Sequence, residues 1–215
     1  MIEAEAATAD TLDDLRRAIA ACRLCRDAPW DGAGNRLPHE PRPVAVISDA
    51  AKILIAGQAP GLRVNNTGLP FNDASGDRLR QWLDVTREEF YDPDRFAIVP
   101  MGFCFPGYDD HGSDLPPRRE CAPTWRSQVM AAMPQVELVL AIGQYAQKWH
   151  LGGRRLKSMT DTVMNWRSFL GTNEGPAVLP MPHPSWRNTA WLKTHPWFES
   201  DLLPVLRERV KSSMR

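Results

Sequence analysis

The sequence lacks any net charge, because its 26 lysines and arginines balance 26 aspartates and glutamates. A chain without a basic excess has no overall electrostatic signature of a polyanion-binding protein. It also lacks an apolar run that approaches the roughly 20 residues of a membrane span, so we expect no membrane partner. The N-terminus is acidic and does not resemble a secretory signal peptide. These absences predict a cytoplasmic protein.

Internal repeats, low-complexity tracts and linker-like segments are also missing from the sequence. A chain of 215 residues is long enough for one large domain, and we treat residues 1–215 as a single domain. No feature of the sequence predicts an obligate protein partner. What the sequence has in abundance is proline, with 19 residues, which favours long, shaped loops over long helices.

Four short apolar segments alternate with helical patterns along the chain. The segments are too short for helices and rich in aliphatic residues, which predicts buried strands. They are Ile53–Ala56, Phe96–Val99, Val136–Ile142 and Ala177–Met181. A weaker strand candidate is 44–47, and helices are expected at 11–24, 75–84, 119–133, 143–150 and 199–212, with a weak one at 160–169. The alternation predicts an α/β fold, a three-layer αβα sandwich with a central four-stranded parallel sheet.

Each predicted strand ends in a loop that contains glycine, proline or histidine. These loops are 57–61, 100–105, 143–144 and 183–188. In a parallel sheet the carboxyl ends of the strands lie at one edge, where open α/β sheets bind their ligands. The first loop holds two glycines and a proline in five residues, so its backbone can approach a ligand closely. The sequence therefore predicts a ligand site built from these loops.

Four cysteines form a second pattern. Cys22 and Cys25 have C-x2-C spacing at the end of the first predicted helix, and Cys104 and Cys121 follow later in the chain. Unrelated buried cysteines are one interpretation, and a thioredoxin-like redox pair fits poorly because the motif closes a helix. Cytoplasmic thiols stay reduced, which favours a metal site over disulfides. Four thiolates suit either zinc or an iron–sulfur cluster, and the spacing alone does not choose between them.

Three motifs and the cysteine pattern carry a family resemblance. They are Gly57-Gln58-Ala59-Pro60-Gly61, Thr67-Gly68-Leu69-Pro70-Phe71, His183-Pro184-Ser185 and the order of the cysteines. Together they resemble the uracil-DNA glycosylase superfamily, and most closely its iron–sulfur members of families 4 and 5, over nearly the whole chain. It implies a monofunctional DNA glycosylase of base excision repair, which hydrolyses the N-glycosidic bond of a flipped-out damaged base such as uracil. It also favours a 4Fe-4S cluster on Cys22, Cys25, Cys104 and Cys121, with zinc as the alternative.

The resemblance assigns roles to individual residues. Phe71 would stack on the base, and His183 would donate a hydrogen bond to it as negative charge develops; His195 is a rival histidine that does not follow a strand. Asp73 would activate water, although an aspartate before a helix is equally typical of an N-cap. The other base-binding candidates are Gly57, Gln58, Ala59, Pro60, Gly61 and Asn72. Ser185, Trp186, Arg187 and Asn188 would contact DNA.

Two positions depart from the family pattern. Gln58 is neutral where family 4 usually has glutamate, and Pro100 begins a segment that lacks the usual asparagine side chain. Base selection would then depend on the backbone of 101–103 or on a side chain such as Asn72 or Gln144. The departures keep a second interpretation open: an inactive iron–sulfur protein of the same fold that binds nucleic acid or a nucleotide.

Overall fold

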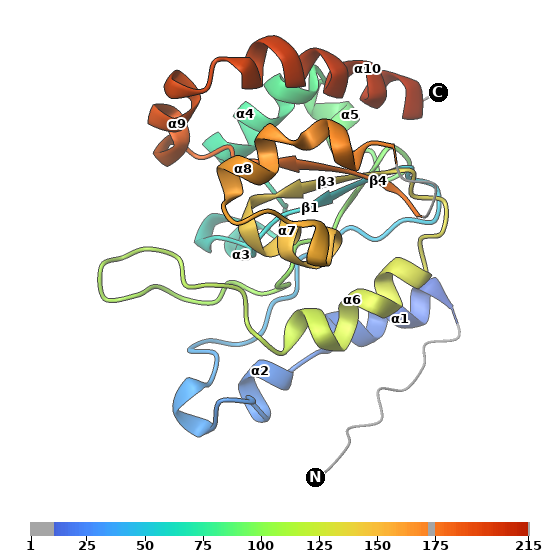
Figure 1. Cartoon of the computed structure of the whole chain (residues 1–215). Coiled ribbons are helices and arrows are strands. Elements are labelled where there is room, and N and C mark those ends of the chain that lie inside the picture. Colours follow the sequence, from blue (N-terminus) through green and yellow to red (C-terminus); the bar gives the residue numbers. More distant parts are fainter. Residues whose placement is uncertain (1–10, 172–174, 215) are drawn as a thin grey trace.

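The computed structural model describes residues 11–171 and 175–214. Its centre is a parallel sheet of four strands in the order β2-β1-β3-β4 (Figure 1). The strands are β1 (Ile53–Ala56), β2 (Phe96–Ile98), β3 (Leu138–Ile142) and β4 (Ala177–Met181). The predicted four-stranded parallel sheet is therefore confirmed. The weaker strand predicted at 44–47 is wrong, because that segment forms only an isolated antiparallel bridge between Val46 and Ile98.

Side chains of each strand alternate between two separate cores. In β1, Leu54 and Ala56 belong to one core, whereas Ile53 and Ile55 belong to the other. This alternation follows from the period of two in an extended chain. Both faces are covered, so both sets are apolar and the strand reads as a continuous hydrophobic run.

Helices cover both faces of the sheet (Figure 1). The first core includes side chains from α1 (Leu12–Ala20), α6 (Cys121–Ala131) and α7 (Gly143–Leu151). The second includes side chains from α4 (Ala74–Leu83), α5 (Arg87–Tyr91), α8 (Met159–Met164) and α10 (Leu203–Ser213). The expected three-layer αβα sandwich is thereby confirmed. Within the described parts of the chain, no helix is long and apolar enough to cross a membrane.

Several short helices were not among those that the sequence pattern predicted. They are α2 (Leu24–Asp27), α3 (Leu62–Thr67), α5 and α9 (Thr189–Thr194). Each has six residues or fewer, which is too short for a helical hydrophobic period to stand out. Helix α5 nevertheless has a complete capping box, in which Thr86 and Glu89 bond each other's backbone N–H groups.

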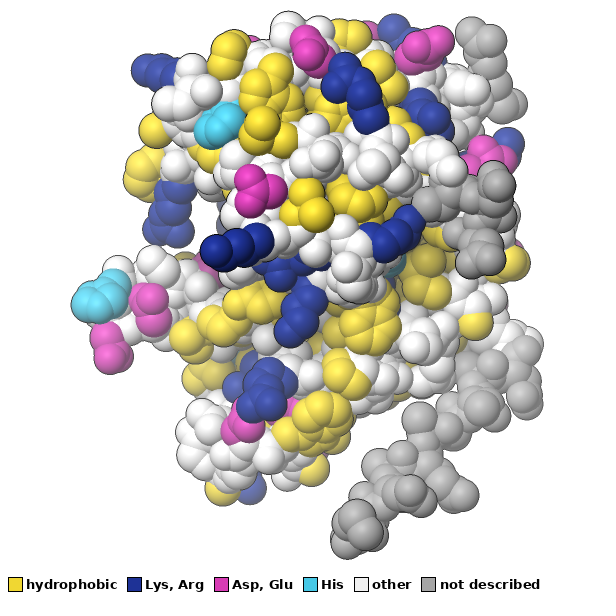
Figure 2. All heavy atoms as spheres, in the orientation of Figure 1, with side chains coloured by type: hydrophobic (Ala, Val, Ile, Leu, Met, Phe, Trp, Pro, Cys, Tyr) yellow, Lys and Arg dark blue, Asp and Glu magenta, His cyan; other side chains and the backbone are white. Residues whose placement is uncertain are grey.

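The segment between β2 and α6 projects from the body of the molecule (Figure 1). It bends back on itself through a bridge between Tyr108 and Asp114, and we call residues 107–115 the projecting hairpin. Figure 2 shows acidic and histidine side chains gathered on this projection. Its tip residues, Asp109 to His111, are exposed. The base of the hairpin reaches the carboxyl edge of the sheet.

Candidate active site

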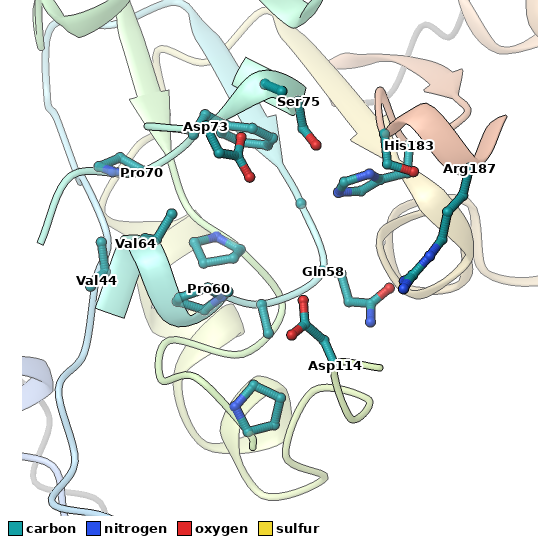
Figure 3. A pocket seen from close by; sticks show the side chains of 18 of the residues that line it. Val44, Gln58, Pro60, Val64, Pro70, Asp73, Ser75, Asp114, His183 and Arg187 are labelled. Carbon is teal, nitrogen blue, oxygen red and sulfur yellow. The ribbon is translucent and has the colours of Figure 1, made fainter. Parts of the chain in front are cut away.

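A cavity of about 530 Å³ lies at the carboxyl ends of the strands. Its wall comes mainly from the loop after β1, the start of α4 and the loop after β4. Figure 3 shows side chains from these segments directed into the same space. The structure thus brings together five parts of the predicted site: 57–61, Phe71, Asp73, His183 and 185–188.

The loop after β1 is fixed to the segment after β2 by backbone hydrogen bonds. The carbonyl oxygens of Gly57 and Gln58 accept from the N–H groups of Met101 and Gly102, each at 2.9 Å. The N–H of Phe103 donates to the sulfur of the last cysteine at 3.3 Å. The sequence made these three N–H groups candidates for recognising a base. Each of them already donates a hydrogen bond within the protein. None of the three residues lines the cavity.

Two other side chains considered for base recognition also lie elsewhere. The Asn72 side-chain oxygen accepts a hydrogen bond from Arg87 at 3.2 Å, and Asn72 is not among the residues that line the cavity. Gln144 is exposed near the start of α7 and is likewise absent from the lining. The polar groups that face the cavity come from other positions.

Phe71 is held in a strained conformation beside the cavity. Its φ of 52° is unusual for a bulky residue. Its carbonyl oxygen accepts from the Tyr91 hydroxyl at 3.2 Å and from Arg80 at 3.4 Å. Gly76 passes so close that an added Cβ would lie 1.7 Å from that oxygen, and a Cβ on Gly57 would lie 3.3 Å from the ring. Strain that neighbours maintain in this way is typical of functional sites.

Asp73 is a helix cap that also lines the cavity. It is the N-cap of α4, where its Oδ1 accepts the Gly76 N–H at 2.9 Å. The positive end of the helix stabilises the charge of a carboxylate in this place. Asp73 also lines the cavity, and Figure 3 shows its carboxyl group directed into it. One oxygen thus caps the helix, and the carboxyl group as a whole faces the cavity.

His183 follows β4 and, like Asp73, points into the cavity (Figure 3). Burial lowers the pKa of its imidazole, and the negative charge of Asp73 partly counteracts this effect. The ring is therefore neutral at neutral pH, with one N–H available for donation. The rival His195 does not line the cavity; its Nδ1 lies 2.8 Å from the Trp191 carbonyl oxygen, and its ring stacks on Trp191.

The loop of residues 185–188 has an inward and an outward side. The carbonyl oxygen of Ser185 accepts from Arg78 of α4 at 2.9 Å, and the Asn188 amide donates to the carbonyl oxygen of His183 at 2.7 Å. Trp186 in contrast is 74% exposed, with the Arg187 guanidinium 5.6 Å from the centre of its ring. Asn188 thus fixes the site from within, and Trp186 and Arg187 stand at its mouth.

The four cysteines line a second, smaller hollow. All four are free thiols. Burial raises the pKa of Cys25 to about 11 and that of Cys104 to about 12, and it raises the pKa of Cys121 as well. Negative charge on Cys22 would raise all three pKa values further, as expected for sulfurs that face one another. Buried thiols of this kind become thiolates only when a cation is bound among them.

Zinc and an iron–sulfur cluster require different arrangements of four cysteine sulfurs. Among the described residues, no group of three or more His, Cys, Asp or Glu side chains could hold a metal ion. Zinc would require all four sulfurs at about 2.3 Å from one ion. An iron–sulfur cluster binds each sulfur to a different iron, so its ligands lie farther apart. The structure nevertheless places all four cysteines around one hollow.

Several other residues line the cavity without having been predicted from the sequence. They are Val44, Val64, Pro70, Ala74, Ser75, Ile98, Pro106, Asp114 and Leu115. Asp114 is the most consequential, because it adds a second carboxyl group. Burial raises the pKa of this carboxyl group, and Arg187 counteracts the effect. A position more than 40 residues after Asp73, inside an irregular segment, gave no sequence signal for this placement.

Comparisons with known proteins found a related protein, a solved structure and a family profile. The Type-4 uracil-DNA glycosylase of Sulfurisphaera tokodaii is 21% identical over 182 residues, which cover 82% of this chain and 75% of that protein. The NMR structure of a candidate uracil DNA glycosylase from Methanosarcina acetivorans is 16% identical with a TM-score of 0.46, and the match covers 76% of this chain and 94% of that one. The family profile of the uracil DNA glycosylase superfamily matches residues 44–207. Because this match spans well over half of the chain, the protein belongs to the uracil DNA glycosylase superfamily.

Proposed function

We propose that this protein is a monofunctional DNA glycosylase, which hydrolyses the N-glycosidic bond of a damaged base turned out of DNA. The observation that supports this most directly is the convergence of Phe71, Asp73 and His183 in one cavity. His183 follows Phe71 and Asp73 by more than 100 positions in the sequence. An aromatic ring, a carboxylate and a neutral imidazole are the groups that release of a base requires.

Each group has a distinct part in the reaction. The Phe71 ring stacks on the extruded base. As the bond between C1′ and the base nitrogen breaks, its electron pair passes to the base, and the N–H of His183 stabilises the developing charge. The Asp73 carboxylate stabilises the cationic sugar and orients a water molecule toward C1′. The water loses a proton to Asp73 as it adds to C1′. Asp73 then gives up this proton, which reaches the departing base anion through solvent, so the base leaves in its neutral form.

The loop of residues 185–188 would contact the DNA duplex. The exposed ring of Trp186 can fill the space that the extruded base leaves, and the guanidinium of Arg187 can contact a phosphate. Ser185 and Asn188 hold this loop beside His183. A substrate that must be unstacked fits this arrangement, because the stacking surfaces lie at the mouth and in the wall of the cavity.

A 4Fe-4S cluster is the group we assign to Cys22, Cys25, Cys104 and Cys121. When bound, it would supply cross-linking by metal–thiolate bonds and take no part in base release. These residues tie α2 and the start of α6 to the loop after β2, so a cluster would stabilise the fold beneath the cavity. We propose that the protein acts in the cytoplasm, where thiols stay reduced and can hold a cluster.

The test is an assay of base release on single-stranded and duplex oligonucleotides that contain uracil, hypoxanthine or xanthine. We expect release of at least one base by the purified protein, and none by a double variant Asp73→Asn, His183→Ala. Binding without release by the wild type would instead support the inactive binding protein, to which neutral Gln58 and Pro100 point. A brown colour with broad visible absorbance would identify the iron–sulfur cluster and exclude zinc.

A further inference from the structure

The side of the cavity opposite Asp73 and His183 holds unpartnered polar side chains. Figure 3 shows Gln58 and Asp114 there, with the end of Arg187 directed toward Gln58. Across the described residues, neither the Gln58 amide nor the Asp114 carboxyl group forms a hydrogen bond or ion pair. Asp114 is an exposed residue and Gln58 is half-buried. Polar groups that face a cavity and have no partners in the protein are free to bond a ligand.

Asp114 is held in place by the projecting hairpin. The Leu115 N–H donates to the Gly107 carbonyl oxygen at 2.9 Å, which closes the base of the hairpin. At its tip the Asp109 carboxylate accepts from the N–H groups of His111 and Ser113 at 2.9 and 2.8 Å. The Asp114 Oδ2 lies 3.5 Å from the position of a Cβ on Gly61, so the carboxyl group reaches the loop after β1. The hairpin thus holds the backbone at Asp114 in place, and the carboxyl group itself stays free to bond a ligand.

We propose that Asp114 is a specificity-determining residue, whose carboxylate accepts a hydrogen bond from the ring N–H of a deaminated base. This inference rests on the proposed function and names the base edge that the cavity selects. Other parts of the structure leave this task open, because the N–H groups of 101–103 are bonded within the protein and Asn72 lies outside the lining.

The selection follows from hydrogen-bond chemistry. An ionised carboxylate only accepts hydrogen bonds. Uracil has an N–H at ring position 3 and hypoxanthine has one at position 1, whereas cytosine and adenine have a lone pair at these places. A lone pair facing Asp114 would be repelled, and the carboxylate would stay unpaired. Gln58 has both an acceptor and donors, so it can bond the neighbouring carbonyl of a deaminated base.

The proposal also separates the two carboxylates of the cavity. Asp73 is anchored at a helix N-terminus, which stabilises its charge, and it influences His183 electrostatically. Asp114 has no such anchor for its oxygens, so both oxygens can accept a hydrogen bond from an N–H group of a ligand. We therefore assign hydrolysis to Asp73 and discrimination between bases to Asp114.

The experiment compares equilibrium binding of four free bases with the wild type, Asp114→Asn and Asp110→Asn. Asp110 is an exposed acid on the same hairpin that does not line the cavity, so its variant controls for charge. We expect the wild type and Asp110→Asn to bind uracil over cytosine, and hypoxanthine over adenine, by about 10-fold or more. Asparagine presents an acceptor or a donor, so Asp114→Asn should lower both ratios at least fivefold.

Base release from oligonucleotides is then measured with the same three proteins. Unchanged binding ratios in Asp114→Asn, or no binding of any base by the wild type, would overturn the inference. So would equal loss of release on every base with unchanged binding, because Asp114 would then be the hydrolytic carboxylate. Binding ratios that depend on Asp114 in a protein that releases no base would uphold the inference and refute the proposed glycosylase activity.

Discussion

Replacing Asp73 separates its structural contribution from its chemical one. Asparagine caps a helix about as well as aspartate, so Asp73→Asn keeps the hydrogen bond to the Gly76 N–H and removes only the charge. We expect its free energy of unfolding to change by no more than about 0.5 kcal/mol. Asp73→Ala loses the cap as well, which costs about 1 kcal/mol. For a chain of this size that cost lowers the melting temperature by about 2–4 °C.

Activity should respond differently from stability. Both variants lack the carboxylate that orients water, so the single-turnover rate of base release should fall by about 10²- to 10⁴-fold in each. The matched control is Ser158→Ala, which removes the N-cap of α8, a hydrogen bond of 3.0 Å to the Asp161 N–H. Ser158 does not line the cavity. This control should lose about the same stability as Asp73→Ala and keep the wild-type rate.

The outcomes that refute this reasoning are distinct. A wild-type rate in Asp73→Asn would show that the carboxylate takes no part in hydrolysis. If Ser158→Ala lost as much activity as Asp73→Ala, the effect at Asp73 would be one of stability alone. If Asp73→Asn unfolded several degrees below the wild type, its cap would depend on the charge and not on the side-chain oxygen.

Three further predictions concern other parts of the molecule. Gly76→Ala places a Cβ 1.7 Å from the backbone oxygen of Phe71, so it should cost at least about 1–3 kcal/mol in denaturant unfolding; an unchanged midpoint would contradict the close approach. His183 has a pKa below its unfolded value of about 6.5, so its contribution to stability is complete above that pH and is lost as the pH falls below it. His183→Gln should therefore flatten the decline in unfolding free energy between pH 7 and 5, and a parallel decline in both proteins would count against a buried neutral imidazole. Cys121→Ser should abolish the visible absorbance of the purified protein and lower its melting temperature, whereas a retained cluster would show that this thiol is not a ligand.

Much of the fold follows from local features of the sequence. Ile53–Ala56 and Ala177–Met181 form strands with the predicted bounds, because strands buried on both faces leave continuous apolar runs. The cap at Thr11 was also predictable, and its side chain accepts from the Asp14 N–H. Helix α9 and the projecting hairpin gave no comparable signal, since a helix of six residues has no visible period and residues 107–115 contain no alternating apolar pattern.

For the site, the sequence by itself determined which residues could act: a tight glycine loop after one strand, Phe71 and Asp73 before a helix, and a histidine after the last strand. Tertiary structure alone decided where these residues lie relative to one another. Only the parallel sheet brings the ends of β1 and β4 to one cavity, and only the hairpin returns Asp114 to it. Asp73 shows the difference clearly: its sequence context predicts a cap or a catalytic group, whereas its position shows one oxygen on the helix and the carboxyl group facing the cavity. The reason is physical. The cap joins two residues that are three positions apart in the sequence, whereas the cavity is formed by residues that are more than 100 positions apart.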